Sequence, residues 1–357
     1  MISVFEHPWL GGLFGDDEAA ALWSAEAQTG HFRAFERALA LALEATGHVA
    51  PDHGTMAARA IETAGLDSDS LARGTAADGL PIPELVRQLR AAAGKSRAAV
   101  HSGATSQDVL DTALTLTLRA VSDLIIRRLS ALDEALGTLC VMFGDTPLTG
   151  RTRMQVALPI TVSDRVRAWR SPLASHIRAL GALRPEVERL QLAGAVGTRA
   201  AFGAQGPEIV RRVADDLGLQ AAPVWHTERS RLAEYAGRLS AISGGLGKMG
   251  ADVTLMAQQG VDAIRLSGGG GSSAMPHKSN PVLAELLVTL ARFNATQLAG
   301  VHHALVHEQE RSGAAWMLEW MLLPPMTLAT VRGLGAAGEL CRQVISVGDQ
   351  EQGQGRS

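Results

Sequence analysis

The residues best suited to chemistry lie in a glycine-rich segment, 268–281, with the sequence GGGGSSAMPHKSNP. Four consecutive glycines give a backbone that can open and close over a substrate. Two hydroxyls, Ser272 and Ser273, and the ammonium group of Lys278 follow within a few residues. Asn280 is placed to cap the next helix, whose start would attract an anion. A plain Gly/Ser linker that enters a helix has the same composition, so spacing alone leaves both interpretations open.

A second polar segment, HSGATSQDVLDT, occupies residues 101–112. Thr105 and Asp108 have the spacing of a capping box, with Asp in place of Glu, and are expected to start a helix. Three side chains beside this positive helix end could bind a carboxylate: His101, Ser106 and Gln107. A well-capped helix without a ligand has the same pattern, and the residues alone favour that plainer interpretation.

Long helices are expected to hold these segments in place. Residues 108–143 contain no proline and one glycine, and their apolar residues recur at steps of three and four. At about 1.5 Å per residue this helix would run roughly 50 Å, which suits a bundle or an oligomeric core. Further long helices are expected at 161–191, 227–260 and 281–308.

The first hundred residues predict shorter helices. One is expected at 17–47, capped by Asp16 or Asp17 and ended by Gly47, a second at 54–64, and a third from the prolines at 81 and 83 to about residue 93. The Gly-, Asp-, Ser- and Pro-containing stretch between them, 65–83, is expected to be a loop. No stretch alternates like a strand, and aromatic residues make up 4% of the chain. The predicted fold class is therefore all-α.

Composition excludes several classes of function. The net charge is −3 over 357 residues, without a basic stripe, which argues against nucleic acid as a partner. No apolar run reaches membrane length and no signal peptide is expected, so the predicted location is cytoplasmic. Cys140 and Cys341 are expected to be reduced thiols. His303 and His307 would lie one helical turn apart, but the pattern lacks a third ligand, so no metal and no cofactor is expected.

Three segments together resemble a known family. Residues 271–281 are similar to the Gly-Ser-Ser-x-Met-Pro-x-Lys-x-Asn-Pro signature of fumarases, argininosuccinate lyases and adenylosuccinate lyases. Residues 101–108 resemble the family's His-x-Gly-x-Thr-Ser-x-Asp block. Residues 150–161, GRTRMQVALPIT, resemble its Arg-Thr-His-x-Gln-x-Ala-x-Pro block. The resemblance covers nearly the whole chain and identifies it as a member of the fumarase/aspartase superfamily.

One departure narrows the resemblance. Most lyases of the family have His where this chain has Arg153, and in them that His pairs with a Glu that remains here as Glu285. An arginine is not a general acid at neutral pH, because its pKa exceeds about 12. Arg153 is therefore expected to pair with Glu285 or to bind a substrate carboxylate. The 3-carboxy-cis,cis-muconate cycloisomerases also lack this His, and residues 194–206, 225–234 and 307–320 resemble that branch as well.

The resemblance implies a reaction and a set of site residues. It implies a cofactor-free cycloisomerase acting on a small tricarboxylate, with Ser272 as proton donor, Lys278 stabilising the carbanion, and Glu285 also catalytic. The expected substrate-binding residues are His101, Thr105, Ser106, Gln107, Arg151, Thr152, Arg153, Gln155, Ser273, Met275, Asn280 and Arg311. Arg229 is a further cationic candidate. The alternatives are a fumarate-releasing lyase such as adenylosuccinate lyase, a cycloisomerase that prefers a sulfo-substituted muconate, and a non-catalytic helical scaffold.

The resemblance also implies an assembly. Members of the family form homotetramers whose long helices make a central bundle, and each active site draws on three subunits. The expected divisions of this chain are an N-terminal helical domain at 1–105, a central long-helix domain at 106–345 and a tail at 346–357. The family's C-terminal domain is expected to be shortened or absent.

Overall fold

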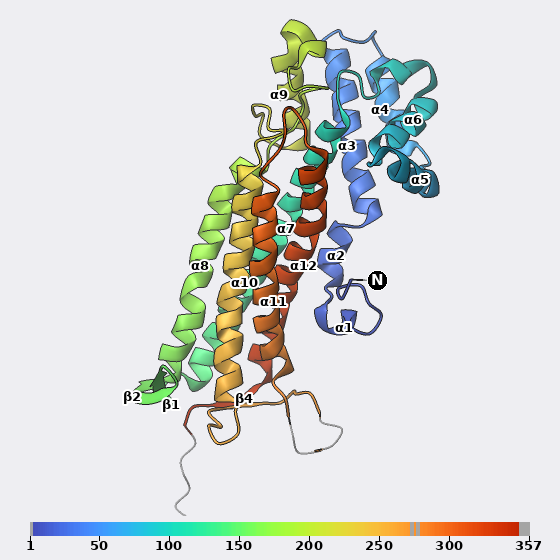
Figure 1. The fold of residues 1–357 in the computed structure, drawn as a ribbon. Coiled ribbons are helices and arrows are strands. Elements are labelled where there is room, and N and C mark those ends of the chain that lie inside the picture. The colour runs from blue at the N-terminus through green and yellow to red at the C-terminus, as the bar shows by residue number, and fades with distance from the viewer. Residues whose placement is uncertain (1–2, 272–274, 276–278, 350–357) are drawn as a thin grey trace, which may run out of the picture.

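Five long helices form a bundle that makes up most of the molecule (Figure 1). The structure is a computed structural model and describes residues 3–271, 275 and 279–349. The bundle helices are α7 (Ser106–Phe143), α8 (Val162–Val187), α10 (Ser230–Met256), α11 (Val282–His303) and α12 (Gly313–Gln343). The predicted all-α class is confirmed, and the expected long helices at 108–143, 161–191, 227–260 and 281–308 correspond to four of these five.

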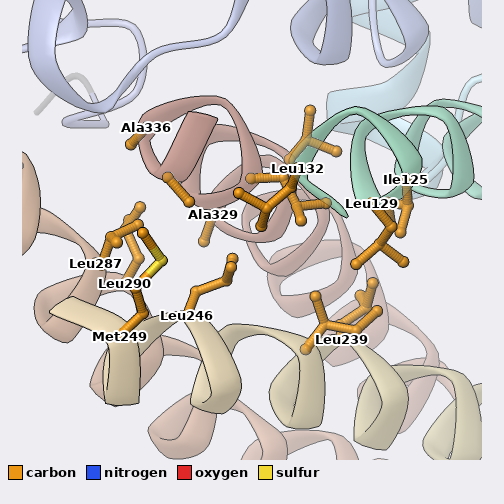
Figure 2. Packing of buried hydrophobic residues seen from close by; sticks show 14 of the residues in the cluster. Ile125, Leu129, Leu132, Leu239, Leu246, Met249, Leu287, Leu290, Ala329 and Ala336 are labelled. Atoms are coloured by element: carbon orange, nitrogen blue, oxygen red, sulfur yellow. The ribbon is translucent and has the colours of Figure 1, made fainter. Parts of the chain in front are cut away.

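The bundle is held together by one large apolar core (Figure 2). Helix α7 contributes Leu118, Ile125, Leu129 and Leu132, all of them buried, at the three- and four-residue steps seen in the sequence. Helices α10 and α11 approach most closely, since a Cβ added at Gly250 would lie 2.4 Å from the carbonyl oxygen of Ala284. Only glycine allows that approach.

A second group of helices lies along one side of the bundle in Figure 1, with α3 to α6 near its upper end and α1 and α2 beside its middle. These helices are α1 (Gly11–Phe14), α2 (Asp17–Leu22), α3 (Ala25–Ala45), α4 (His53–Thr63), α5 (Ser68–Asp78) and α6 (Ile82–Ala93), followed by the 3-10 helix Gly94–Ala99. Helices α1 and α2 pack against the bundle core. Helices α3 to α6 pack around a second core, which includes the first turns of α7, the 3-10 helix Ala200–Gln205 and α9 (Gly206–Leu217). The predicted boundary at residue 105 remains a prediction.

Two predictions for this region are wrong. The helix expected at 17–47 breaks at Trp23 and Ser24, because the Ser24 hydroxyl accepts a hydrogen bond from the Ala27 N–H and starts a new helix. The loop expected at 65–83 contains α5. The Asp67 side chain caps α5 by accepting from the Ser70 N–H, and Gly79 ends it at a φ of 78°. Local capping therefore outweighed the loop-like composition.

The expectation of no strands is also wrong, since four short strands form two small sheets. Strand β1 (Pro147–Thr152) pairs antiparallel with β2 (Gln155–Thr161), and β3 (Ile264–Leu266) pairs antiparallel with β4 (Val344–Val347). The first pair is a hairpin at the lower end of the bundle in Figure 1, where most of its residues are exposed. Only Leu148 and Gly150 of the hairpin are buried, so the sustained alternation that marks a half-buried strand is missing.

Helix α12 lies outside the predicted helices, although it is one of the longest. It contains two consecutive prolines, Pro324 and Pro325, in its interior. Proline removes a helical hydrogen bond and usually ends a helix. Here the helix continues because its apolar residues are buried in the bundle core on both sides of the two prolines.

Candidate active site

The polar segment 101–112 lies at the upper end of the bundle, where α7 begins. The predicted capping box is present: the Thr105 N–H donates to Asp108 Oδ2 at 2.9 Å, and the Thr105 side chain accepts from the Asp108 backbone. Asp108 is fully buried and also accepts from the backbone N–H groups of Ala193 and Gly194, both at 2.9 Å. Its Oδ1 lies 3.0 Å from His226 Nε2. One carboxylate thus joins three distant stretches of chain.

These stretches approach one another closely at Gly103. Its φ is 77°, and an added Cβ would lie 2.4 Å from the ring of Phe202. Gly194, with a φ of 76°, faces the carbonyl oxygen of Gly103 in the same way. Gly103 and Gly194 therefore allow close contact between the loops at this end of the bundle.

A buried ion triad lies directly behind this helix end. The Arg229 guanidinium donates to Asp111 at 2.8 and 3.0 Å and to Glu319 at 2.8 and 2.5 Å. All three side chains are at most 2% exposed. Burial raises the pKa of Asp111 against the opposing charge of Arg229, whereas the pKa of Glu319 falls because Arg229 outweighs its burial. Trp316 also donates to Asp111, at 3.1 Å.

The triad corrects one prediction. Arg229 was expected as a cation for the substrate, but it is buried and both sides of its guanidinium are occupied by carboxylates. A buried, fully paired arginine stabilises the fold and offers no free donor to an anion. Its contribution to the site is the support that it gives to α7 and α12.

Arg311 is the exposed cation of this cluster. Its Nε donates to Gln107 Oε1 at 2.9 Å, and its Nη2 donates to Thr105 Oγ1 at 3.0 Å. The Gln107 amide in turn donates to Asp111 Oδ2 and to the carbonyl oxygen of His226. The structure therefore brings Thr105, Gln107 and Arg311 together, as the sequence predicts. Ser106 is the first residue of α7, beside them.

His101 lies at the edge of the same cluster. Its Nδ1 lies 2.5 Å from Glu36 Oε1, on helix α3. Burial acts against the charged imidazole, but Glu36, followed by Asp108, raises the pKa of His101 above its usual range. His101 is therefore positioned from the N-terminal helices, while Thr105 and Gln107 belong to the bundle.

The second group of predicted residues lies at the lower end of the bundle. Arg151, Thr152, Arg153 and Gln155 are exposed in the β1–β2 hairpin. Arg153 and Met154 form its turn with φ values of 49° and 69°, a left-handed conformation that non-glycine residues seldom adopt. Such backbone conformations are concentrated at functional sites.

The glycine-rich segment ends at this same lower end. Ser272, Ser273 and Lys278 lie outside the described residues, and Met275 is exposed. Asn280 bridges to Gly270 through backbone hydrogen bonds of 3.0 Å in both directions. The expectation that Asn280 caps the next helix is wrong, since Pro281 holds the cap position of α11 and provides no side-chain hydrogen bond.

One predicted ion pair is absent. Arg153 and Glu285 form no ion pair with each other, although the structure describes both residues. Glu285 is exposed in the first turn of α11, and Arg153 is at the tip of the hairpin. Within one chain, binding a substrate carboxylate is therefore the role left for Arg153, while a pair with Glu285 of another subunit remains a prediction.

The two groups of site residues lie at opposite ends of the chain's fold (Figure 1). Helix α7 has 38 residues and so extends about 57 Å at 1.5 Å per residue. His101 to Gln107 precede or open that helix, whereas the hairpin follows its other end. A single substrate molecule cannot touch both groups within one chain.

The predicted histidine pair also separates in the structure. Helix α11 ends at His303, so His307 is not one turn further along it. His307 is buried instead, with Nε2 3.6 Å from Glu319 Oε1. Across the described residues, no group of three or more His, Cys, Asp or Glu side chains is arranged to hold a metal ion. No helix in this described part has the length and apolar character needed to cross a membrane.

Sequence reasoning missed several residues that organise the site. Among them are three acids, Glu36, Asp111 and Glu319, all buried in helices and all hydrogen-bonded to a cationic or polar partner. The available signal is an acidic residue among the apolar positions of a helix, because a buried carboxylate requires a partner. In a sequence, a single buried acid is harder to recognise than a motif.

Comparison with known proteins establishes the family. Residues 17–295 match the family model described as lyase. The chain belongs to this lyase family, the fumarase/aspartase superfamily. It is 37% identical over 302 residues to a 3-carboxy-cis,cis-muconate cycloisomerase of Pseudomonas aeruginosa, covering 82% of this chain and 65% of that one. The chain thus spans about two thirds of that relative's length.

Other relatives carry different names. An N-acetyl-S-(2-succino)cysteine lyase of Enterococcus italicus is 32% identical, over 90% of this chain and 72% of that one. Among solved structures, the 3-carboxy-cis,cis-muconate lactonizing enzyme from Pseudomonas putida superposes with a TM-score of 0.88. It is 32% identical, and the match covers 95% of this chain and 77% of that one. The family therefore contains both cycloisomerases and lyases close to this chain.

Proposed function

We propose that this chain is a 3-carboxy-cis,cis-muconate cycloisomerase, which forms 4-carboxymuconolactone in the protocatechuate branch of the β-ketoadipate pathway. The observation that carries the proposal is Arg153. It replaces the histidine of most lyases, and an arginine is not a general acid at neutral pH, so the histidine–glutamate relay of those lyases has no counterpart here. Relatives named for the cycloisomerase reaction support the same conclusion.

The reaction needs one bond-forming step and one proton. A carboxylate oxygen of the substrate adds to a carbon of a conjugated double bond and closes the lactone ring. The electron pair of that double bond moves to the carbon beside another carboxylate, which holds it in the aci form. Ser272 delivers the proton to this carbon, and Lys278 stabilises the charge while it develops. These two roles follow from the positions of the residues in the family motif.

The substrate carries three carboxylates, so the site must be locally cationic in a chain with a net charge of −3. Arg311 offers an exposed guanidinium that Gln107 and Thr105 already orient. Arg153 offers a second at the hairpin tip. Because Arg311 is already held in place, it binds a carboxylate at a lower cost of ordering its side chain.

We further propose that the complete site forms only in a homotetramer. The two groups of site residues stand at opposite ends of α7, about 57 Å apart along its axis. Antiparallel association of the bundles would bring the hairpin and glycine-rich segment of one subunit to the α7 start of another. Exposed apolar side chains on the bundle and hairpin, including Val141, Met142, Val156 and Leu158, are available for such an association.

Ultraviolet absorbance provides the test, because lactonisation shortens the conjugated system of the muconate. The enzyme is expected to consume 3-carboxy-cis,cis-muconate faster than a sulfo-substituted analogue. Adenylosuccinate and N-acetyl-S-(2-succino)cysteine are expected to release no fumarate. Release of fumarate from either compound, with no loss of muconate absorbance, would reject the cycloisomerase in favour of a lyase.

The second candidate is therefore a fumarate-releasing lyase. The observation in its favour is the 32% identity to a lyase that is named for a succinylated cysteine. Lyases and cycloisomerases of this superfamily share the glycine-rich motif, so the motif does not choose between them.

A further inference from the structure

The contact between Glu36 and His101 joins two parts of the molecule. Glu36 is on α3, among the N-terminal helices, and its side chain is fully buried. His101 lies just before α7 and is 13% exposed. The Glu36 Oε1 oxygen lies 2.5 Å from His101 Nδ1. The histidine is thus tethered at one nitrogen by a residue that no motif of the family resemblance includes.

The other nitrogen of His101 remains available. Nε2 makes no hydrogen bond within the described residues, and it is not among their fully buried polar atoms. When Glu36 accepts from Nδ1, a protonated ring carries an N–H at Nε2 that points away from the tether. The same loop leads to Thr105, which accepts a hydrogen bond from Arg311.

The backbone at His101 is also unusual. Its φ is 58°, in the left-handed region that few residues other than glycine adopt, although histidine does so more often than most. The loop therefore holds the histidine in a conformation that its backbone does not prefer. Conformations of this kind persist where surrounding contacts determine them, and the Glu36 carboxylate is such a contact.

The charges around His101 come from three helices. Glu36 of α3 and Asp108 of α7 favour the imidazolium, while Arg90 of α6 opposes it. The Arg90 guanidinium is directed to the carbonyl oxygen of Val100, at 3.2 and 3.3 Å. The second oxygen of Glu36 is buried without a hydrogen-bond partner among the described residues. A carboxylate in that position depends on the nearby imidazolium for its stabilisation.

We propose that Glu36 is a positioning residue that keeps His101 as an imidazolium with Nε2–H available to a substrate carboxylate. The N-terminal helices thereby add one cation to a site that must bind three carboxylates. The inference rests on the proposed function, since a tricarboxylate is the ligand that this cation serves. Arg311 and His101 then bind carboxylates from the same end of α7.

The test is the pH profile of KM in the Glu36→Gln enzyme, with 3-carboxymuconate as substrate. In the wild-type enzyme KM should rise as pH increases through the raised pKa of His101, because the neutral ring loses the favourable charge. Glu36→Gln should move that rise to lower pH. At pH 7.5 its KM should exceed the wild-type value by roughly tenfold, while kcat changes less than about threefold.

Glu44→Gln is the matched control. Glu44 lies two turns further along α3 and accepts hydrogen bonds from the backbone N–H groups of Thr55 and Asp52, at 2.6 and 3.1 Å. Its substitution removes a hydrogen-bonded carboxylate from the same helix without touching His101. It should lower stability and leave the pH at which KM rises unchanged. An equal shift in both variants would mean that the effect is structural and would overturn the proposal.

A second variant and a second ligand complete the design. His101→Gln should lose the rise in KM altogether, which tests the proposal even if Glu36→Gln does not fold. Affinity for the unreactive propane-1,2,3-tricarboxylate, measured by calorimetry on the assembled protein, should follow the same pH profiles. A wild-type enzyme that does not turn over 3-carboxymuconate contradicts the proposed function alone. Profiles that coincide between wild type and both variants contradict the role of Glu36.

Discussion

The two ends of the bundle differ in how far one chain completes them. At the upper end, Asp108 and the Arg229 triad are buried and their carboxylate oxygens are occupied by hydrogen bonds. At the lower end, the hairpin around Arg153 is exposed and its tip has a strained backbone. The comparison supports the proposal that one half of the site is built within the chain and that a neighbouring subunit completes the other half.

The largest effect on activity is expected in the glycine-rich segment. Ser272→Ala should reduce turnover of 3-carboxymuconate by a factor of about 1,000 or more, because it removes the proposed proton donor. Its free energy of unfolding should stay within about 0.5 kcal/mol of the wild-type value, because the substitution removes a single hydroxyl group. Steady-state kinetics and urea denaturation measure the two quantities. An active Ser272→Ala enzyme would remove this serine from the mechanism.

The largest effect on stability is expected at the upper end. Arg229→Met leaves Asp111 and Glu319 buried without their cation and should destabilise the protein by about 3–5 kcal/mol. The pKa of Asp111 is raised, so this carboxyl group takes up a proton readily as pH falls, and protonation removes its buried charge. The loss of stability should therefore become smaller at lower pH. Urea titrations at pH 5.5 and 8 compare the two conditions. A loss below about 1 kcal/mol at both pH values would show that the triad does not organise this end.

A smaller effect on activity is expected at Arg311, the exposed residue of the cluster that is proposed to bind the substrate. Lysine keeps the charge but cannot donate to Gln107 and Thr105 from one planar group. Arg311→Lys should therefore raise KM by about tenfold and change stability little. Arg265→Lys is a control of the same type, in strand β3 and away from the start of α7. Equal KM values for wild type and Arg311→Lys would contradict the assignment of Arg311 to substrate binding.

The smallest effect on stability is expected at the hairpin tip. Arg153→Ala should change the free energy of unfolding by less than about 0.5 kcal/mol, because the side chain is exposed and makes no ion pair with Glu285. The same substitution should raise KM, since one carboxylate of the substrate loses its cation. A loss of stability comparable to that of Arg229→Met would erase the proposed difference between the two ends.

Much of this arrangement is readable in the sequence, for reasons that differ between elements. The α7 helix follows from the steps of its leucines and from the capping box at Thr105 and Asp108, both of which are local signals. Helix α5 and the break at Ser24 depend on capping residues, and the composition around them is typical of loops. Helix α12 depends on tertiary burial that overrides Pro324 and Pro325. Local patterns are thus reliable where propensity and packing agree.

The sequence predicts which motifs contribute to the site better than it predicts which side chains pair with one another. Thr105, Gln107 and Arg311 could be grouped from sequence because each belongs to a recognisable block. The pairing of His101 with Glu36, and of Arg229 with two acids, joins residues 65 to 118 positions apart, and no local spacing encodes it. For Arg153 the sequence left two roles open, and within one chain the exposed hairpin makes no pair with Glu285.

Subunit complementation tests the central claim most directly. Ser272→Ala and Arg311→Ala each remove one residue assigned to the site, from two different segments of the chain, and each variant alone should be nearly inactive. After the two are mixed, dissociated in urea and reassembled, random mixed tetramers should recover about a quarter of the wild-type activity, because some sites then combine two intact halves. No recovery in tetramers shown to contain both chains would mean that each site is built within one subunit, and would contradict the account.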